Sequence, residues 1–326
     1  MRDLKNKLTP GKNSRNIQSR RGKSFGYQVL GFGSGGGASP FIVATGGTIT
    51  CSGNFKMHTF TGPGTFCVES AGAPGGSDTV SYMVVAGGGG GGYFYGAAGG
   101  AGGYREGKAS TDCYTASPLN APAGLPVSVQ GYPITVGGGG PSPSATSPGN
   151  RRACQGSSSV FSSITSAGGG GGGGGQHGGC QGGDGGSGGG GGGSSGQPGG
   201  CGNIPSVSPA QGTQGEDTDT PTGRGGAGGG ATTAGGAGGE NVAGAGAGTG
   251  INPSSCVGTP GPCGSLRYFA GGGGGSNPCQ PGGPGGGSGG PGPVASATAN
   301  TGGGQGGCVA GGGGGSGIVI IRYKYQ

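Results

Sequence analysis

Ala167 is followed by an unbroken run of eight glycines, Gly168–Gly175 (AGGGGGGGG). Three further glycine runs start directly after an alanine that ends a short run rich in β-branched or aromatic residues: Gly87–Gly92, Gly271–Gly275 and Gly311–Gly315. A flexible linker would not need strand-forming residues and an alanine before each glycine run. Glycine can follow the polyproline II path, which has three residues per turn and rises ~3.1 Å per residue. Because each glycine keeps its N–H, the runs predict stacked polyglycine II tracts joined by backbone hydrogen bonds.

Backbone hydrogen bonds alone would not hold such tracts in place. Fixing one residue costs about 1–2 kcal/mol, and glycine loses more conformational freedom than any other residue. A hydrogen bond returns only about 0.5–1.5 kcal/mol net. The ends of the tracts therefore need anchors, and the sequence offers β-strands and cysteines.

The composition leaves one competing interpretation, which is disorder. Of 326 residues, 103 are Gly and 23 are Pro, a level typical of low-complexity chains. The repeated strand-to-glycine junctions, ten cysteines and a closing apolar run at Ile318–Tyr323 argue against disorder. The glycines follow no Gly-X-Y period, which excludes collagen.

The expected fold is mainly β with extended polyglycine II-like tracts and no significant helix. Short β-type runs separated by turn residues predict a small antiparallel β module at 41–86. A short strand and a Gly/Ser hinge are expected at 25–40, before this module. The glycine-rich body is expected at 87–326, with strands at 127–136, 158–164, 266–269 and 317–325.

Residues 1–24 form a basic arm. Eight of the 17 basic residues and one of the ten acidic residues lie in 1–23, so the other nine of each sign balance. The basic residues are Arg2, Lys5, Lys7, Lys12, Arg15, Arg20, Arg21 and Lys23. The arm lacks the apolar core of a secretory signal, and no run is long enough for a membrane span. Docking onto an acidic protein of an assembly is favoured over nucleic-acid binding, the other interpretation of such charge.

The even number of cysteines favours disulfides in an oxidising setting. The candidates are Cys51, Cys67, Cys113, Cys154, Cys180, Cys201, Cys256, Cys263, Cys279 and Cys308. The favoured pairs are near neighbours, Cys51 with Cys67 and Cys256 with Cys263. The alternative is that the cysteines are reduced, small buried residues.

Two segments poor in glycine, 109–130 and 203–223, are expected to be exposed binding loops. The candidate ligand-binding residues are Tyr93, Phe94, Tyr95, Glu216, Asp217 and Asp219. The aromatic residues could stack on sugars or instead cap the tracts internally. The three acidic residues could bind Ca²⁺, but a solvated acidic loop is favoured.

No cofactor, metal or enzymatic activity is expected. His177 and Cys180 have a spacing that zinc ligands use, but the chain has only two histidines and no Cys-x2-Cys pair. No set of Ser, His and Asp suggests a nucleophile and its base.

The order of the segments resembles the glycine-rich domain of bacteriophage tail-fibre and tail-tip (adhesin) proteins, of the polyglycine II type, over about 46–326. The segments are Gly64-Thr65-Phe66, Ser81–Ala86 before glycines, Tyr132–Gly138, Ala167 before glycines, and Gly317–Tyr323. The resemblance implies a non-enzymatic virion protein that recognises a host-surface glycan or outer-membrane protein. Its basic arm would bind other virion proteins, and a homo-oligomer such as a trimer is open.

A virion protein would be made in the host cytoplasm without a signal peptide and released by lysis. Two other functions stay open. One is a head fibre or capsid-decoration protein, and the other is a secreted glycine-rich structural or ice-binding protein.

Overall fold

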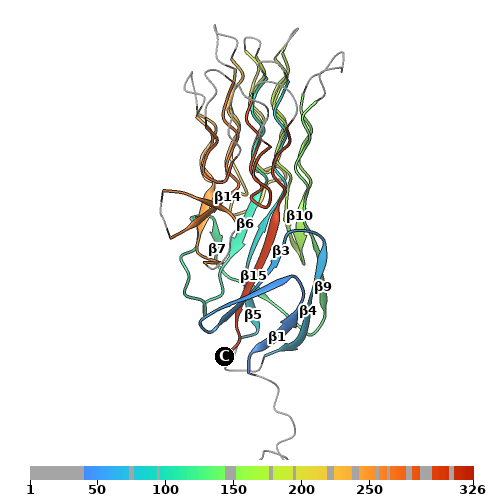
Figure 1. Ribbon diagram of the computed structural model, residues 1–326, viewed down its shortest axis with the longest axis vertical. Helices are drawn as coiled ribbons and strands as arrows, with labels where there is room; N and C mark the ends of the chain where they lie inside the picture. The colour runs from blue at the N-terminus through green and yellow to red at the C-terminus, as the bar shows by residue number, and fades with distance from the viewer. Residues whose placement is uncertain are drawn as a thin grey trace, which may run out of the picture. The chain divides into compact units, whose positions relative to one another are not determined.

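The computed structural model in Figure 1 describes most of the chain from Pro40 onward. The described residues are 40–72, 77–93, 96–143, 152–175, 179–193, 196–218, 224–236, 242–253, 257–262, 265–276, 281–286, 296–307 and 312–326. The predicted basic arm and the predicted strand segment before Pro40 lie outside them. The described residues form three β-sheets and contain no α-helix, so the prediction of a mainly β fold is confirmed. A membrane-spanning helix is not found among them.

The largest sheet has seven strands, and the last strand of the chain lies near its centre. The strand order is β2 (Thr48–Ser52), β3 (Phe55–Phe60), β15 (Ile318–Lys324), β5 (Thr79–Val85), β6 (Tyr104–Gly107) and β7 (Asn120–Ala121). β8 (Leu125–Pro126) also pairs with β5. β15 is antiparallel to both neighbours and places Ile321 opposite His58 and Tyr82. The sheet is therefore complete only when residues near the end of the sequence insert between β3 and β5.

Two smaller sheets accompany it. The five-stranded sheet has the order β1 (Ile42–Thr45), β4 (Gly64–Ala71), β9 (Gly131–Thr135), β10 (Ser159–Phe161) and β11 (Ile164–Ser166). The three-stranded sheet has the order β12 (Ala247–Thr249), β14 (Arg267–Phe269) and β13 (Thr259–Pro260). Together, β1–β15 are called the strand region below.

The central strands of the seven-stranded sheet, β5 and β15, are buried on both faces. One core joins side chains of this sheet, such as Tyr323, to Phe66 and Phe161 of the five-stranded sheet. A second core packs alternate residues, such as Ile320, against Tyr104 and Phe269. This explains why the sequences of β5 and β15 are nearly continuous apolar runs rather than alternating ones.

The strands of 41–86 do not pair only among themselves. β1 and β4 belong to the five-stranded sheet, whereas β2, β3 and β5 belong to the seven-stranded sheet. β15 lies between β3 and β5, whereas in a self-contained module at 41–86 the strands would pair with one another. The predicted strand at 158–164 is instead the hairpin of β10 and β11, which turns at Ser162 with a positive φ of 55°. The segment predicted as a strand at 127–136 is regular only from Gly131.

The glycine runs leave the strand region as extended tracts that lie side by side (Figure 1). These tracts are called the glycine array below. They are 86–93, 96–103, 137–143, 152–158, 167–175, 179–193, 196–203, 211–218, 224–236, 242–246, 270–276, 281–286, 301–307 and 312–317.

Lateral hydrogen bonds in the glycine array repeat every three residues. From tract 86–93, every third amide donates to the antiparallel tract 96–103. The pairs are Ala86 to Gly103, Gly89 to Gly100 and Gly92 to Ala97, with N···O distances of 3.0, 2.8 and 2.8 Å. The next amide in each turn donates to tract 152–158, and Gly88 donates to Gly315 at 2.9 Å. A three-residue period directed at three neighbours is the geometry of polyglycine II, as the sequence predicted.

The tracts approach too closely for side chains at most glycine positions. A Cβ added to Gly89 would overlap the carbonyl oxygen of Gly170, and one added to Gly139 would overlap that of Gly314. The tracts nevertheless contain fully buried alanines, such as Ala97, Ala98 and Ala101. Packing in the array is therefore set by backbone contacts, with a methyl group only where a gap admits one.

Candidate binding surface

The loop that begins at 109 is fastened to the seven-stranded sheet by a buried ion pair. Arg322 Nε donates to both carboxylate oxygens of Asp112, at 3.0 and 3.1 Å, and Ser81 Oγ donates to the same carboxylate at 2.9 Å. A second guanidinium nitrogen of Arg322 donates to the carbonyl of Ile251 at 3.1 Å. Both charged side chains are almost fully buried. The ion pair thus ties two loops to the centre of the sheet.

A second buried carboxylate, Glu106, completes this attachment. Its Oε2 accepts hydrogen bonds from the Tyr104 hydroxyl at 2.8 Å and the Ser117 amide at 2.9 Å. Its Oε1 accepts one from the Thr249 hydroxyl at 2.8 Å. Burial, and next the negative charge of Glu106, raise the pKa of Tyr104 well above its usual value. These contacts bind the 109–119 segment to the strand region, and half of the residues of the first predicted binding loop, 109–130, are exposed.

The described part of the second predicted loop, 203–218, divides into two pieces. Asn203 Oδ1 accepts the amides of Val207 at 3.1 Å and Gln211 at 3.2 Å, which holds a partly exposed turn. Gln211 in turn accepts the amide of Ala167 at 2.8 Å, where a glycine tract begins. This turn therefore lies at the end of the glycine array that meets the strands.

The candidate carboxylates in this segment contact backbone amides of neighbouring tracts. Glu216 is buried and accepts the amide of Ala227 at 2.9 Å. Asp217 is exposed and accepts the amide of Gly199 at 2.8 Å. Asp219, the third candidate, lies outside the described residues. Among the described residues, no three His, Cys, Asp or Glu side chains gather closely enough to hold a metal ion.

The end of the glycine array away from the strands is reached at residues such as Tyr93, Gly175 and Thr218. Tyr93 is half-buried, and its carbonyl accepts the amide of Gly175 at 3.2 Å, which joins two tracts there. Thr218 Oγ1 donates to the carbonyl of Gly192 at 2.6 Å. Phe94 and Tyr95, the other aromatic candidates, lie outside the described residues. The structure therefore places Tyr93 at the end of the array and the first predicted loop beside the strands. The described part of the second loop continues from Gln211, near the strands, to Thr218 at the end of the array.

The chain matches the family described as glycine-rich domain over residues 59–324. It belongs to that family. The match begins in β3 and ends in β15, so the domain spans both the glycine array and the central strands that anchor it. No curated protein and no solved structure matches the chain.

The disulfide predicted between the near neighbours Cys51 and Cys67 is absent: both thiols are free and exposed. The reason is topological, because Cys51 is in β2 of the seven-stranded sheet and Cys67 is in β4 of the five-stranded sheet. Cys113, Cys154 and Cys201 are also free and exposed, and Cys180 is half-buried. His177 and four candidate cysteines lie outside the described residues: Cys256, Cys263, Cys279 and Cys308.

Sequence reasoning did not find the polar cluster around Arg322, Asp112 and Glu106. The available signal was a charged residue within the closing apolar run, Ile320-Ile321-Arg322-Tyr323, since a buried strand rarely carries an unpaired arginine. No local pattern identifies its partner, which lies 210 residues earlier in the chain.

Proposed function

We propose that this glycine-rich domain is a non-enzymatic phage virion protein, a tail-fibre or tail-tip adhesin that contributes to host-surface recognition. The observation that carries the proposal is the three-way lateral bonding of the glycine array. Each tract is hydrogen-bonded to several neighbours, so residues at the array's end are held on a rigid support. Such preorganisation lowers the entropic cost of binding.

The order of strands and glycine runs, which resembles that of tail-fibre and tail-tip proteins, supplies the biological setting. In this proposal the strand region faces the particle, and the far end of the array faces a host glycan or outer-membrane protein. Tyr93 is the described residue best suited to contact a sugar ring, because aromatic faces pack on apolar sugar surfaces. The protein would then be located in the virion.

A head-fibre or capsid-decoration protein is the second candidate, since the same array could serve as a spacer without a ligand. Five exposed thiols among the described cysteines give less support to a secreted structural or ice-binding protein, since disulfides persist in oxidising environments.

The test is binding of the labelled full-length chain to intact cells of a panel of bacteria. Tyr93→Ala is expected to weaken binding to a recognised strain about tenfold, the effect of losing about 1.4 kcal/mol. Val129→Ser is the control, since Val129 is 64% exposed in a loop beside β9 and far from the array's end. If the chain copurifies with particles but binds no cells, the decoration function is favoured. An equal loss in both variants would contradict recognition at the array's end.

A further inference from the structure

Tract 167–175 of the glycine array has one side whose amides lack hydrogen-bond partners. Every third amide, from Gly169 to Gly175, donates to tract 86–93, and the next set donates to tract 179–193. The third set donates to no described residue, and its members are Gly168, Gly171 and Gly174. All three residues are buried. Buried amides without a partner are rare in proteins, so this side, called the open side below, is suited to an added acceptor.

Other tracts at the centre of the array use all three sets of amides. In tract 96–103, one set donates to 167–175, the second to 224–236 and the third to 301–307. Tract 86–93 also donates in three directions, in part through the side chain of Gln305. The unused set of amides therefore marks a neighbour that tract 167–175 lacks among the described residues.

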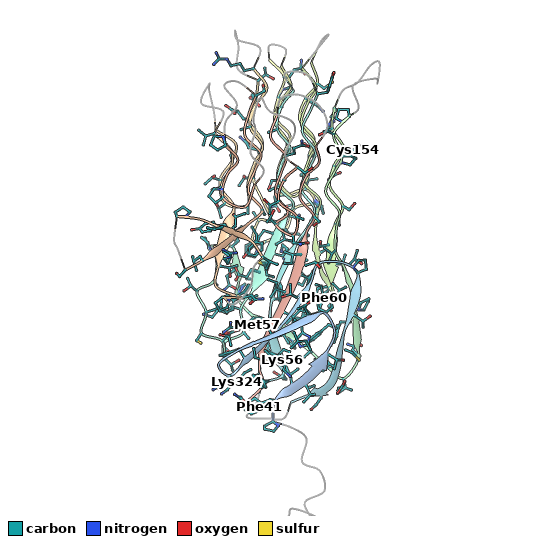
Figure 2. The ribbon with its side chains drawn as sticks, viewed as in Figure 1. Phe41, Lys56, Met57, Phe60, Cys154 and Lys324 are labelled. Atoms are coloured by element: carbon teal, nitrogen blue, oxygen red, sulfur yellow. The ribbon has the colours of Figure 1, made fainter. Side chains whose placement is uncertain are left out.

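Two segments flank the open side, tract 152–158 and residues 179–185. Both donate hydrogen bonds to carbonyl groups of the tract between them, for example from Gly183 to Gly171 at 2.8 Å. Figure 2 shows Cys154, in the first flank, at the margin of the glycine array. The open side therefore lies between two tracts at the margin of the array.

Two long side chains from the first flank cover the open side. Gln155 Nε2 donates to the carbonyl of Gly168 at 3.1 Å. A Cβ added to Gly183 would lie 2.6 Å from a guanidinium nitrogen of Arg152 and 2.9 Å from the nitrogen of Gly171. Arg152 therefore extends from one flank to the other beside an unpaired amide. Because both side chains present donors here, neither satisfies the amides beneath them.

The first flank also offers acceptors to an added chain. The carbonyl oxygens of Ala153 and Gly156 lie against Gly171 and Gly168. Neither oxygen accepts a hydrogen bond from a described residue. Donors and acceptors thus both recur every three residues along the open side.

This spacing selects the conformation of the ligand. Groups three residues apart in a polyglycine II tract are separated by about 9.3 Å along its axis. The carbonyls on one side of a β-strand recur every two residues, about 6.6 Å apart, and those of an α-helix bond within the helix. A single small anion would reach only one of the three amides. A chain in the polyproline II conformation has the matching three-residue repeat.

We propose that the open side of tract 167–175 receives an extended polyproline II segment, rich in glycine and proline, from a partner protein. Glycine is needed where the segment meets the tract, since a Cβ on the existing neighbour Gly89 would overlap the carbonyl oxygen of Gly170. Proline at the outward positions favours the bound conformation before binding and so lowers its entropic cost. A second copy of this chain fits less well, because its described glycine runs already bond within their own array. Such binding does not depend on host recognition at the array's end.

The probe is a nine-residue peptide of three Pro-Gly-Gly units, which spans about 28 Å in this conformation. Amide exchange of the glycine-labelled full-length chain is followed by NMR with and without the peptide. In the free chain, the amides of Gly168 and Gly171 are expected to exchange about tenfold faster than those of Gly169 and Gly170, because they lack a bond. Saturating peptide should remove this difference. Equal protection of all these amides in the free chain would overturn the proposal.

Substitutions of the two covering side chains test the same position by affinity. Arg152→Ala with Gln155→Ala should bind the peptide about tenfold more tightly, since no side chain has to be displaced. Ser157→Ala is the control and should bind as wild type does, because the Ser157 amide bonds to Gly138 on another side of the same tract. A nine-residue peptide of alternating Thr and Val, which favours the β conformation, should not bind.

Three results would overturn the inference. The first is no protection of Gly171 by the Pro-Gly-Gly peptide in either the wild type or the double variant. The second is equal binding of the Thr-Val peptide. The third is protection of Gly168 and Gly171 that rises with protein concentration alone, together with a dimer by light scattering, which would make a second copy the occupant.

Discussion

The strand region and the glycine array bury residues to a similar degree by different means. In the strand region, rings and branched side chains such as Phe66, Phe161 and Ile321 fill the space between sheets. In the array, fully buried positions are mostly glycine, and the contacts are carbonyl oxygens against Cα atoms. Burial in the strand region removes apolar area from water, whereas burial in the array mainly satisfies backbone polar groups. The strand region should therefore supply most of the stability, and the array should be least tolerant of added atoms.

The strand region is expected to be most sensitive at its buried ion pair. Asp112→Ala leaves the Arg322 guanidinium buried without its carboxylate, which should cost about 3–5 kcal/mol of unfolding free energy. Denaturant unfolding of the full-length chain measures this. Replacing both partners, Asp112→Ala with Arg322→Met, should recover much of the loss because no unpaired charge remains. If Asp112→Ala had near wild-type stability, the ion pair would not be what ties the two loops to the sheet.

Adjacent glycines in one tract provide a matched test of whether backbone contacts limit packing in the array. A Cβ at Gly139 would overlap the carbonyl oxygen of Gly314, whereas a Cβ at Gly138 meets nothing within 4 Å. Gly139→Ala should therefore cost about 1–3 kcal/mol through overpacking. Gly138→Ala should be neutral or stabilising by up to about 1 kcal/mol, because it restricts the unfolded chain. Equal effects of the two substitutions, measured by thermal unfolding, would contradict backbone-limited packing.

The sequence was most informative where one residue type determines local geometry. Runs of glycine after strand residues predicted extended tracts with a three-residue period, because glycine alone combines a free N–H with no Cβ. The sequence could not indicate that β15 inserts between β3 and β5, since apolar runs carry no information about which distant strand they join. For the same reason, the pairing of Cys51 with Cys67 by nearness in sequence was wrong.

Candidate site residues were harder to predict than the fold. The sequence around Glu216 is typical of an exposed acidic loop, but its carboxylate accepts a hydrogen bond from the amide of Ala227 in a neighbouring tract. Such a bond depends on the lateral register of two tracts. Register is set by lateral contacts between tracts, which local sequence does not encode.

The smallest expected effect is a pH dependence of the unfolding free energy that arises in the strand region and not in the glycine array. His58 lies buried between the two larger sheets, with the Phe66 and Tyr323 rings beside it. Its Nδ1 lies 2.6 Å from the carbonyl of Gly46, which can only accept, so Nδ1 carries the proton and Nε2 accepts from the Tyr323 hydroxyl at 3.0 Å. Burial is the main cause that lowers the pKa of His58 below 6.5, and the charge of Lys56 adds to it, against the opposing effect of the Gly46 bond.

As the pH falls below about 6.5, the unfolded chain binds a proton at His58 before the folded chain does. The unfolding free energy should therefore decrease as the pH falls from about 6.5 through the lower folded pKa, and this contribution is fully present at higher pH. His58→Gln removes the titrating group, so the difference between wild type and variant isolates this contribution from that of the carboxylates. Denaturant unfolding of both proteins at pH 8, 7, 6 and 5 measures it. Parallel pH profiles for the two proteins would show that His58 contributes nothing. If array amides lose exchange protection before strand-region amides as the pH falls, the acid-sensitive contact lies in the glycine array rather than between the sheets.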